Sequence, residues 1–423
     1  MACLRIFIYM LCDKKREDRG VAMTVKQFQL NPKGCLTLSM ALACGLSATV
    51  AQASGFALIE QSASGQGLSY AGAAANAEDA SVMWFNAAGL TEIQGSQGIV
   101  AAHVILPKTK YTDSATGNSD SPSTTGLVPN IYWKGQYGDY ALGFGVNVPY
   151  GQKLEYSDNW TGRYHALKTD LKSVNLNANV AKQLTSNTAF GFGLNAMQVD
   201  LEMTVGTSPT AEATIKADSW GYGYNVGFLS KFSANGQVGL AYRSEVVQNA
   251  TGTFSSGGAS QKITSDVTLP ATASLSLSQG MGDKFTLLAD ATWTNWKAYD
   301  ELVIKTASGA TLSETNQNFK DSMRYSLGVI YAYNDKWKLR TGLAYDETPV
   351  PDAESRSPRT PDSNKTWVSV GFNYKFTPAM SMDFGYSHLF ADKAKINKTA
   401  PTSLVGEYET DVDIVSAQLV WNY

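Results

Sequence analysis

Cysteine is missing from most of this chain, and charged residues and histidines are scarce. All four cysteines lie at or before Cys44, so the rest of the sequence offers neither a disulfide nor a thiolate ligand. Charged residues make up 17%, below the usual share, and the three histidines are too far apart to predict a metal site. After residue 53 no apolar run is long enough for a transmembrane helix. These absences exclude a disulfide-rich secreted domain and a helical membrane protein.

Signatures of catalysis and of nucleic-acid binding are also missing. No glycine-rich phosphate loop follows a strand-like segment, and the nearest approach to a nucleophile elbow, residues 67–71, lacks its second glycine. The formal net charge is −3, which argues against nucleic acid as a partner. The sequence therefore predicts no catalytic residue, no metal, no cofactor and no nucleic-acid partner.

The first 53 residues contain the features of an export signal. Two lysines precede an apolar stretch at 35–50, and the residues at 51–53 (AQA) form a small-residue cleavage site before Ser54. We expect Met23 to be the true start, which makes the residues before it a misassigned extension. A membrane anchor is the alternative, but the apolar run is short and ends in small residues.

Residues 54–95 differ from everything that follows them. They are rich in glycine, alanine and serine, and they lack a regular alternation of apolar and polar residues. They stand directly before a long series of strand-like segments. We therefore expect them to form a partly helical hatch in the lumen of the structure that those strands build.

Residues 96–423 repeat one pattern, in which apolar residues alternate with small or polar ones until a turn signal. Val370 and Ser369, for example, fall on opposite faces of one segment, and such a period of two specifies a strand between two environments. Fourteen segments are centred near residues 101, 131, 144, 176, 193, 225, 241, 271, 289, 328, 341, 370, 384 and 416. Short turns such as 377–378 alternate with long polar loops, among them 149–167, 298–318, 347–364 and 391–407.

Tyrosine and tryptophan gather near the ends of these segments, as at Trp133, Trp220, Trp296 and Trp367. Aromatic residues so placed are typical of the two membrane interfaces of an outer-membrane barrel. Lipid offers no hydrogen-bond partner to an open strand edge, so the sheet has to close. We therefore expect an all-β fold, a 14-stranded antiparallel transmembrane β-barrel in the outer membrane of a Gram-negative cell. Short turns would face the periplasm, and the terminal aromatic Tyr423 predicts recognition by the barrel-assembly machinery.

A series of short motifs resembles the outer-membrane long-chain fatty acid and hydrocarbon transporter family, the FadL-type channels. In chain order the motifs are 55–56 (GF), 86–89 (NAAG), 147–151 (NVPYG), 160–164 (WTGRY), 242–246 (YRSEV), 269–271 (LPA), 293–296 (WTNW), 340–342 (RTG), 349–352 (PVPD) and 361–362 (PD). Each motif is weak by itself, but their order and spacing together are specific, and they cover essentially all of residues 54–423.

The resemblance implies passive, hatch-gated uptake of a hydrophobic molecule, with a sideways exit at a kinked third strand. The lateral opening would lie at Pro149, Tyr150 and Gly151. The residues are compatible with such a kink, since proline cannot donate to a ladder and glycine weakens a strand. Alternatively, Pro149 simply ends the strand and opens a loop.

The hatch contains candidates for the ligand pathway and for the gate. The pathway candidates are Phe56, Leu58, Met83, Trp84 and Phe85. They either line an apolar pocket, where each buried methylene gains about 0.8 kcal/mol, or pack the hatch against the wall. The resemblance places the gate at Asn86, Ala87 and Ala88, where the family commonly has Asn-Pro-Ala. Proline would fix φ and remove a donor, so Ala87 predicts a looser gate.

A basic site for a ligand carboxylate is not evident in the sequence. Fatty-acid members of the family place basic residues at positions that here correspond to Val205 and Thr315, which weakens the fatty-acid hypothesis relative to a neutral hydrocarbon. The remaining lumen candidates are Arg163, Arg243, Arg324 and Arg340. The alternative is that these arginines belong to the ordinary solvated wall, as is usual for charged side chains that face a lumen.

The sequence thus predicts an outer-membrane channel for the uptake of hydrophobic compounds, and not an enzyme. Long-chain fatty acids are the first hypothesis for the ligand, and neutral aromatic or aliphatic hydrocarbons are the alternative. A general porin is disfavoured because porins usually lack an N-terminal hatch, and a loop-based adhesin or phage receptor is a further alternative. The expected partners are hydrophobic small molecules, outer-membrane lipid and lipopolysaccharide, and the assembly machinery, with the protein as a monomer.

Overall fold

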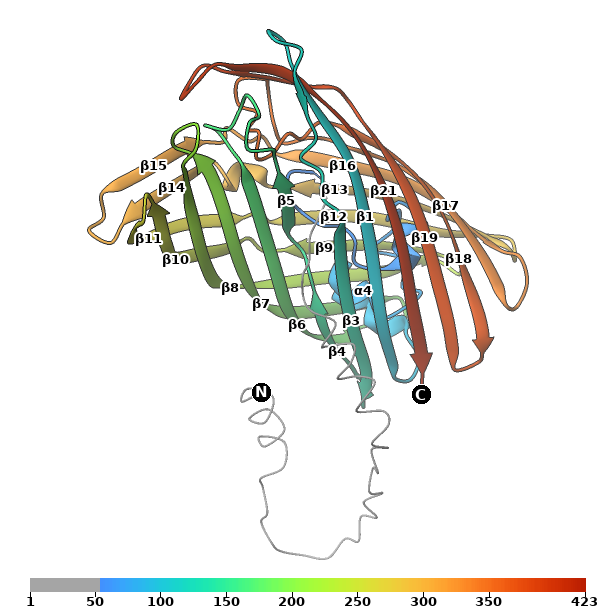
Figure 1. Ribbon diagram of the computed structural model, residues 1–423. Helices are drawn as coiled ribbons and strands as arrows, with labels where there is room; N and C mark the ends of the chain where they lie inside the picture. Colours follow the sequence, from blue (N-terminus) through green and yellow to red (C-terminus); the bar gives the residue numbers. More distant parts are fainter. Residues whose placement is uncertain (1–53) are drawn as a thin grey trace, which may run out of the picture. The chain divides into compact units, whose positions relative to one another are not determined.

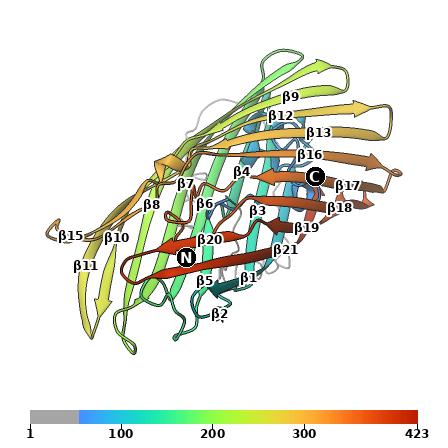
Figure 2. The same ribbon diagram turned by 90° about the horizontal axis from the view of Figure 1, so that it is seen from above.

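The computed structural model describes residues 54–423, so the expected export signal and the start at Met23 lie outside the described residues. Within them, antiparallel wall strands close into one 14-stranded β-barrel around an N-terminal hatch, which confirms the predicted fold class (Figures 1 and 2). The last wall strand pairs with the first from Gln97↔Asn422 to Asp113↔Gly406. In the described range, no helix is both long and apolar enough to cross a membrane.

The wall consists of fourteen strands, several of which are interrupted and carry two labels. In chain order they are β1 (Gln97–Asp113), β3 (Gly126–Tyr137), β4 (Tyr140–Asn147) with β5 (Gly151–Glu155), β6 (Lys168–Gln183), β7 (Thr188–Gly206), β8 (Glu212–Ser233), β9 (Gly236–Arg243) with β10 (Val246–Ser256), β11 (Ala259–Leu269) with β12 (Thr272–Met281), β13 (Phe285–Thr294) with β14 (Glu301–Thr306), β15 (Thr311–Asn316) with β16 (Ser322–Ala332), β17 (Trp337–Asp346), β18 (Lys365–Thr377), β19 (Met380–Ala391) with β20 (Ala394–Lys398), and β21 (Leu404–Asn422). The short β2 (Ser119–Asp120) pairs with β1, and a 3-10 turn, η2 (Trp296–Ala298), follows β13. Short turns lie at one end of the barrel and long connections at the other, which we call the long-loop end (Figure 1).

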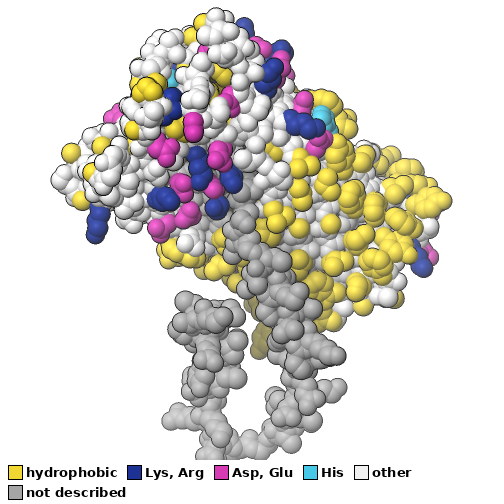
Figure 3. Space-filling model, in the orientation of Figure 1, with side chains coloured by type: hydrophobic (Ala, Val, Ile, Leu, Met, Phe, Trp, Pro, Cys, Tyr) yellow, Lys and Arg dark blue, Asp and Glu magenta, His cyan; other side chains and the backbone are white. Residues whose placement is uncertain are grey.

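The two faces of the wall carry different residues, as the alternation predicts. Leu327 on β16 and Val370 on β18 are 66% and 51% exposed, whereas their neighbours Ser326 and Ser369 are 4% and 0% exposed. The outward apolar side chains gather in a broad belt on the barrel surface (Figure 3). An outer face that meets lipid and an inner face that packs on protein account for both halves of the pattern.

The hatch, residues 54–95, lies in the lumen against glycines of the inner wall. It contains two short helices, α3 (Ala63–Gln66) and α4 (Val82–Phe85), and a 3-10 helix, η1 (Ala87–Glu92). A Cβ atom at Gly239 would lie 1.9 Å from the Ala74 carbonyl oxygen, and one at Gly342 would lie 2.1 Å from the Leu68 carbonyl carbon. Backbones approach this closely only where the wall has no side chain, so the small inward residues make room for the hatch.

Two expectations about individual segments are wrong. Trp133 and Trp220 are exposed on the outer face as expected, but Trp296 and Trp367 are fully buried inside the barrel rather than placed at an interface. Period two does not say on which face a single aromatic near a strand end will fall. Several long connections expected as loops also contain strands, namely β5, β14, β15 and β20, which extend the wall at the long-loop end.

Candidate ligand cavity and hatch

The third wall strand is broken around the proline that the sequence singles out. β4 ends at Asn147 and the strand resumes as β5 at Gly151, with both parts paired to β6. The ladder between β3 and β4 ends at Ile131↔Val146. Pro149 therefore interrupts the strand and does not end it.

The N-terminal segment of the hatch pairs with this break. The Leu58 amide donates to the Pro149 carbonyl at 2.8 Å, and the Gly151 amide donates to the Phe56 carbonyl at 3.0 Å. Between them, Ala57 and Tyr150 form an isolated antiparallel bridge. The hatch thus supplies backbone partners to the part of the third strand that lies between the two ladders.

The segment expected to form the gate, residues 86–88, is fully buried against the wall. Asn86 caps η1 by accepting from the Ala88 amide, and its side-chain amide donates to the Ala74 carbonyl at 2.7 Å and to the Phe228 carbonyl at 2.9 Å. Ala87 and Ala88 have no exposed surface. Asn86 therefore joins two parts of the hatch to β8, a role that only a side chain with both a donor and an acceptor can fill.

An ion-pair network also fixes the hatch to β17 and β19. Glu78 of the hatch accepts from Arg340 at 3.0 Å and pairs with Lys338, and Arg340 donates to Asp383 at 2.7 Å. Burial opposes the charged form of Glu78, but Arg340 and Lys338 outweigh it and hold the pKa of that carboxyl well below its ordinary value. Arg340, one of the expected lumen basic residues, is thus engaged in holding the hatch.

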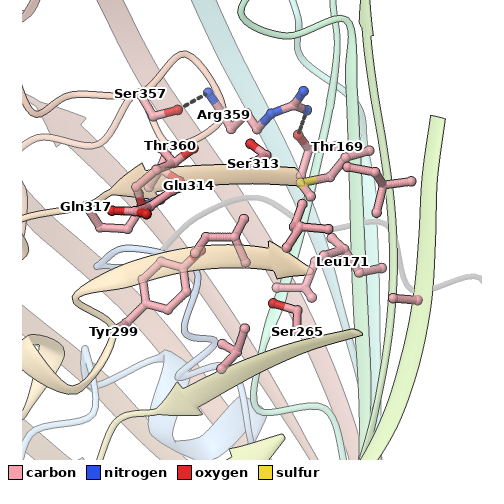
Figure 4. A pocket seen from close by; sticks show the side chains of 18 of the residues that line it. Thr169, Leu171, Ser265, Tyr299, Ser313, Glu314, Gln317, Ser357, Arg359 and Thr360 are labelled. Carbon is pink, nitrogen blue, oxygen red and sulfur yellow. Dashed lines mark hydrogen bonds between the residues drawn. The ribbon is translucent and has the colours of Figure 1, made fainter. Parts of the chain in front are cut away.

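A large cavity of about 730 Å³ lies at the long-loop end, between the wall and the hatch. Its apolar lining comes mainly from β6, β7, β8, β11 and β14: Leu171, Val199, Leu201, Met203, Val205, Ile215, Ala217, Ile263, Val267, Leu269, Leu302 and Ile304. Figure 4 shows Leu171 and Tyr299 on one side of this space and the loop bearing Ser357 and Arg359 on the other. Alternate residues of neighbouring strands face inward together, which is why the lining is drawn from so few strands.

Basic side chains mark one part of the large cavity. Arg359, Lys398 and His165 all line it. Burial lowers the pKa of Arg359 to about 10, which leaves the guanidinium charged at neutral pH, and burial also lowers the pKa of His165. Glu314 is the one acidic side chain among the described residues that line the cavity. The cavity is therefore apolar over most of its surface and cationic in one part.

A small cavity of about 130 Å³ lies deeper, beside the break in the third strand. Its lining includes Leu58, Trp84, Phe85, Pro149, Tyr150, Arg243 and Arg324. Arg243 lies 3.6 Å from the Trp84 ring centroid and donates to the Trp84 carbonyl, while Arg324 donates to the Ser69 carbonyl at 2.9 Å. Both arginines therefore contact the hatch from the wall.

Aromatic rings separate the two cavities. Phe56 and Tyr299 line the large cavity, whereas Tyr150 and Trp296 line the small one. The Phe56 ring lies 4.9 Å from that of Trp296, 5.2 Å from that of Tyr299 and 6.0 Å from that of Tyr150. Phe56 thus lies where the two spaces meet.

The structure distributes the expected site residues over several places. Of the five hatch candidates, Phe56 lines the large cavity, Leu58, Trp84 and Phe85 line the small one, and Met83 is fully buried against the wall. Arg163 donates to the Asp158 and Ala211 carbonyls in the long-loop region and does not line the large cavity.

Arg359 is the basic residue of the large cavity that sequence reasoning missed. Val205 and Thr315, the positions that correspond to basic residues in fatty-acid members of the family, both line the cavity and are uncharged. Arg359 lies instead in the loop 347–364, where no periodic pattern predicts which way its side chain points. The only signal in the sequence is a charged residue between two prolines, Pro358 and Pro361, in a loop otherwise rich in turn residues.

Together, a closed lipid-facing barrel, a lumen occupied by a hatch and an apolar cavity beside that hatch define a plugged transport channel of the outer membrane. The model of one family, described as outer membrane protein transport protein (OMPP1/FadL/TodX), matches residues 44–423. The chain belongs to this family of outer-membrane transporters, whose members are transport channels and not enzymes.

Two relatives align with most of the chain. A long-chain fatty acid transport protein of Salmonella typhi is 30% identical over 404 residues, which are 85% of this chain and 93% of the relative. A 47 kDa outer membrane protein of Pasteurella multocida is 32% identical over 392 residues, 84% of this chain and 91% of the relative. The protein is therefore an outer-membrane channel for hydrophobic compounds.

Solved structures share the fold. A FadL homologue of Pseudomonas aeruginosa superposes with a TM-score of 0.81 at 20% identity, covering 87% of this chain and 99% of that chain. The toluene transporter TodX of P. putida superposes with a TM-score of 0.68 at 18% identity, covering 86% and 98%.

Proposed function

We propose that this channel takes up long-chain fatty acids, which bind in the large cavity, pass the hatch when it moves, and leave sideways at the break in the third wall strand. The observation that carries this proposal concerns Phe56. Its ring lines the large cavity, and its carbonyl accepts from Gly151 at the strand break. One hatch residue thus joins the binding space to the exit, so that a ligand displacing the ring also strains the backbone pairing at the break.

The chemistry of the cavity supports a long apolar ligand. Each methylene that leaves water for an apolar lining gains about 0.8 kcal/mol, whereas a water-filled pore gives a hydrocarbon chain no reason to enter. One of the relatives named above is a long-chain fatty acid transport protein, which supports the same ligand class.

A charge placed in the cavity tests the binding site. Leu201→Glu buries an ionised group in the lining, and we expect oleate binding to weaken at least about tenfold because a buried charge is costly. The control is Gln198→Glu, which adds the same charge to the same strand outside the cavity. Binding is measured by fluorescence on the purified proteins, and uptake in cells that lack their own transporter. Equal binding by the two variants contradicts the site.

Neutral hydrocarbons are the second candidate ligands, because solved structures of similar fold include a toluene transporter and a monoaromatic hydrocarbon channel. A general porin is disfavoured by the hatch in the lumen, and large stable conductance in planar bilayers would favour it. Attachment of cells or phage through the long loops is compatible with transport and would be lost on removal of 347–364.

We also propose contacts with the membrane and with the assembly machinery. Tyr423 pairs through its backbone with Ser96 at the start of the first strand, and its hydroxyl accepts from Trp133 at 2.6 Å. This arrangement supports the C-terminal strand as the assembly signal. Lys108 and Asp413 pair on the outer face at 3.1 Å, where charged headgroups of lipopolysaccharide would lie. A barrel closed on itself needs no second subunit, so we propose a monomer.

A further inference from the structure

We propose that the hairpin β14–β15, residues 301–316, is a flap that opens sideways in the barrel wall and admits hydrophobic ligands to the large cavity. The inference rests on the proposed function, because it takes the large cavity as the binding space, and it adds the entrance through which a ligand arrives. The hairpin connects β13 and β16, which pair with each other from Phe285↔Tyr331 to Thr294↔Ser322. Figures 1 and 2 show it projecting beside β11 at the long-loop end.

The flap is joined to the rest of the wall by little backbone pairing. Its ladder with β11 contains two residue pairs, Ile263↔Thr306 and Thr264↔Lys305, whereas the ladder between β10 and β11 contains eleven. On the other side of the flap, β15 pairs with β14 alone among the described strands, and five of its six residues are exposed. A hairpin with so few hydrogen bonds to its neighbours can move without disrupting the barrel.

Beside these two pairs, side chains close the seam between β11 and the flap. The Ser265 hydroxyl donates to the Val303 carbonyl at 2.8 Å. Val267 and Tyr299 pack against the same apolar cluster. Ser265, Val267 and Tyr299 all line the large cavity, and Figure 4 shows Ser265 and Tyr299 on neighbouring segments beside this space. The seam is thus a strip of the cavity wall where apolar contact replaces a ladder.

A seam of this kind suits an oily ligand. Ile304 of the flap and Ile263 of β11 are buried in one apolar cluster, against which Leu302 packs. Apolar contact has no direction, so a hydrocarbon chain that enters the seam replaces the contacts that it separates. A polar solute offers no such replacement. The flap therefore opens for hydrophobic molecules in preference to polar ones.

The long connections that line the same cavity are tied more firmly than the flap. They reach the cavity around His165, Arg359 and Pro401. His165 Nε2 lies 2.8 Å from the Thr402 carbonyl oxygen, and Arg359 donates to the Thr204 carbonyl at 2.8 Å. These contacts join the connections to one another and to β7. An entrance between the connections would break them, whereas the seam presents mainly apolar contacts.

The flap begins just beyond the lipid-facing part of the wall. On β13, Leu287 is exposed on the outer face, and alternation gives Trp293 the same direction. A tryptophan near the end of a wall strand is typical of the membrane interface. Since β14 starts at Glu301, the seam lies at or above the level of the outer-leaflet head groups, where a molecule that leaves a micelle or the leaflet meets the barrel.

A disulfide across the two-pair ladder tests the flap. Thr264→Cys with Lys305→Cys joins two exposed residues that lie opposite each other, and residues 54–423 contain no other cysteine. Laurate association with the purified full-length protein is measured by stopped-flow fluorescence before and after oxidation. We expect oxidation to slow association about tenfold or more and to leave the equilibrium affinity within about twofold, because the disulfide blocks the path and not the site. Reduction should restore the rate.

The matched control is Thr253→Cys with Lys262→Cys. This pair is also exposed and directly opposed, but it lies in the eleven-pair ladder between β10 and β11, so its disulfide should leave the association rate unchanged. Association at the wild-type rate by the fully oxidised Thr264→Cys, Lys305→Cys protein overturns the flap. Equal slowing by the control disulfide overturns it as well.

If the disulfide does not form, Ser265→Ala decides the matter. This variant removes the tether to Val303 and should speed laurate association about threefold or more, since one hydrogen bond fewer holds the flap. An unchanged rate overturns the proposal. Failure of the proposed function gives a different result, because wild type then binds no laurate. Failure of the flap alone leaves laurate bound at a rate that neither disulfide changes.

Discussion

Asn86 and Ala87 occupy the point where the hatch meets the wall most tightly. The backbone of Asn86 is extended, with φ −153° and ψ 106°, and Ala87 is the first residue of η1. A Cβ atom at Gly227 would lie 1.9 Å from the Asn86 side-chain oxygen and 3.4 Å from the Ala87 nitrogen, so β8 leaves this spot open. An extended residue followed by the first residue of a helix is the arrangement that proline favours.

Ala87→Pro is therefore expected to be tolerated and to tighten the gate. At the first helical position no intrahelical hydrogen bond is lost, and proline should stabilise the fold by about 0.4–1 kcal/mol by restricting the unfolded chain. We expect a higher melting temperature in detergent and slower fatty acid uptake. Ala88→Pro is the matched control, because the Ala88 amide donates to Asn86 at 3.0 Å and proline removes that donor. Equal destabilisation by both variants would contradict this account of the gate.

The third wall strand is the element on which the proposed sideways exit depends. Its two parts pair with β6 on one side, while the hatch segment at Phe56–Leu58 takes up the backbone groups around Pro149. Proline donates no ladder hydrogen bond and glycine lowers the cost of bending, so both residues favour the interruption. The break is therefore encoded in the strand and completed by the hatch.

Pro149→Ala combined with Gly151→Ala tests this element. The double variant should assemble in the outer membrane and take up fatty acids more slowly, because the strand can then extend its ladder and narrow the break. Pro129→Ala, in the neighbouring β3, removes a proline from an unbroken wall strand and serves as the control. Uptake at the wild-type rate by a correctly folded double variant counts against the lateral route.

On the scale of the whole molecule, the hatch is held by contacts spread around the lumen. The hydroxyls of Ser69 and Ser369 lie 2.6 Å apart, and both side chains are fully buried. Glu78 is attached to β17, and Asn86 is attached to β8. Movement of the hatch as one body would break all of these contacts, whereas a local change near Phe56 would leave them in place.

A disulfide between hatch and wall distinguishes these two kinds of opening. The described residues contain no cysteine, so Ser69→Cys with Ser369→Cys introduces a single pair. If the hatch moves as a body, the oxidised protein should bind laurate but fail to transport it, and reduction should restore uptake. The single Ser69→Cys variant controls for the substitution. Wild-type uptake by the fully oxidised protein would confine the motion to the N-terminal segment of the hatch.

Much of this architecture follows from the sequence by itself. The period of two, the alternation of short and long connections, the irregular segment 54–95 and the proline in the third strand are local features. They determine a closed barrel, its hatch and its break, because a strand between lipid and protein needs a different residue type on each face. The small inward-facing residues can also be identified in the sequence, before the structure shows that they make room for the hatch.

The tertiary structure alone decided which side chains share the large cavity. Arg359 lies 191 residues from Lys168 along the chain, and only their contact brings its charge to the cavity. Trp296 and Trp367 turned inward, and Arg243, Arg324 and Arg340 contact the hatch, because long connections and a folded plug set those positions. The period of two determines which residues of neighbouring strands face the same side of the wall. It carries no information about the position of a loop that reaches across the barrel.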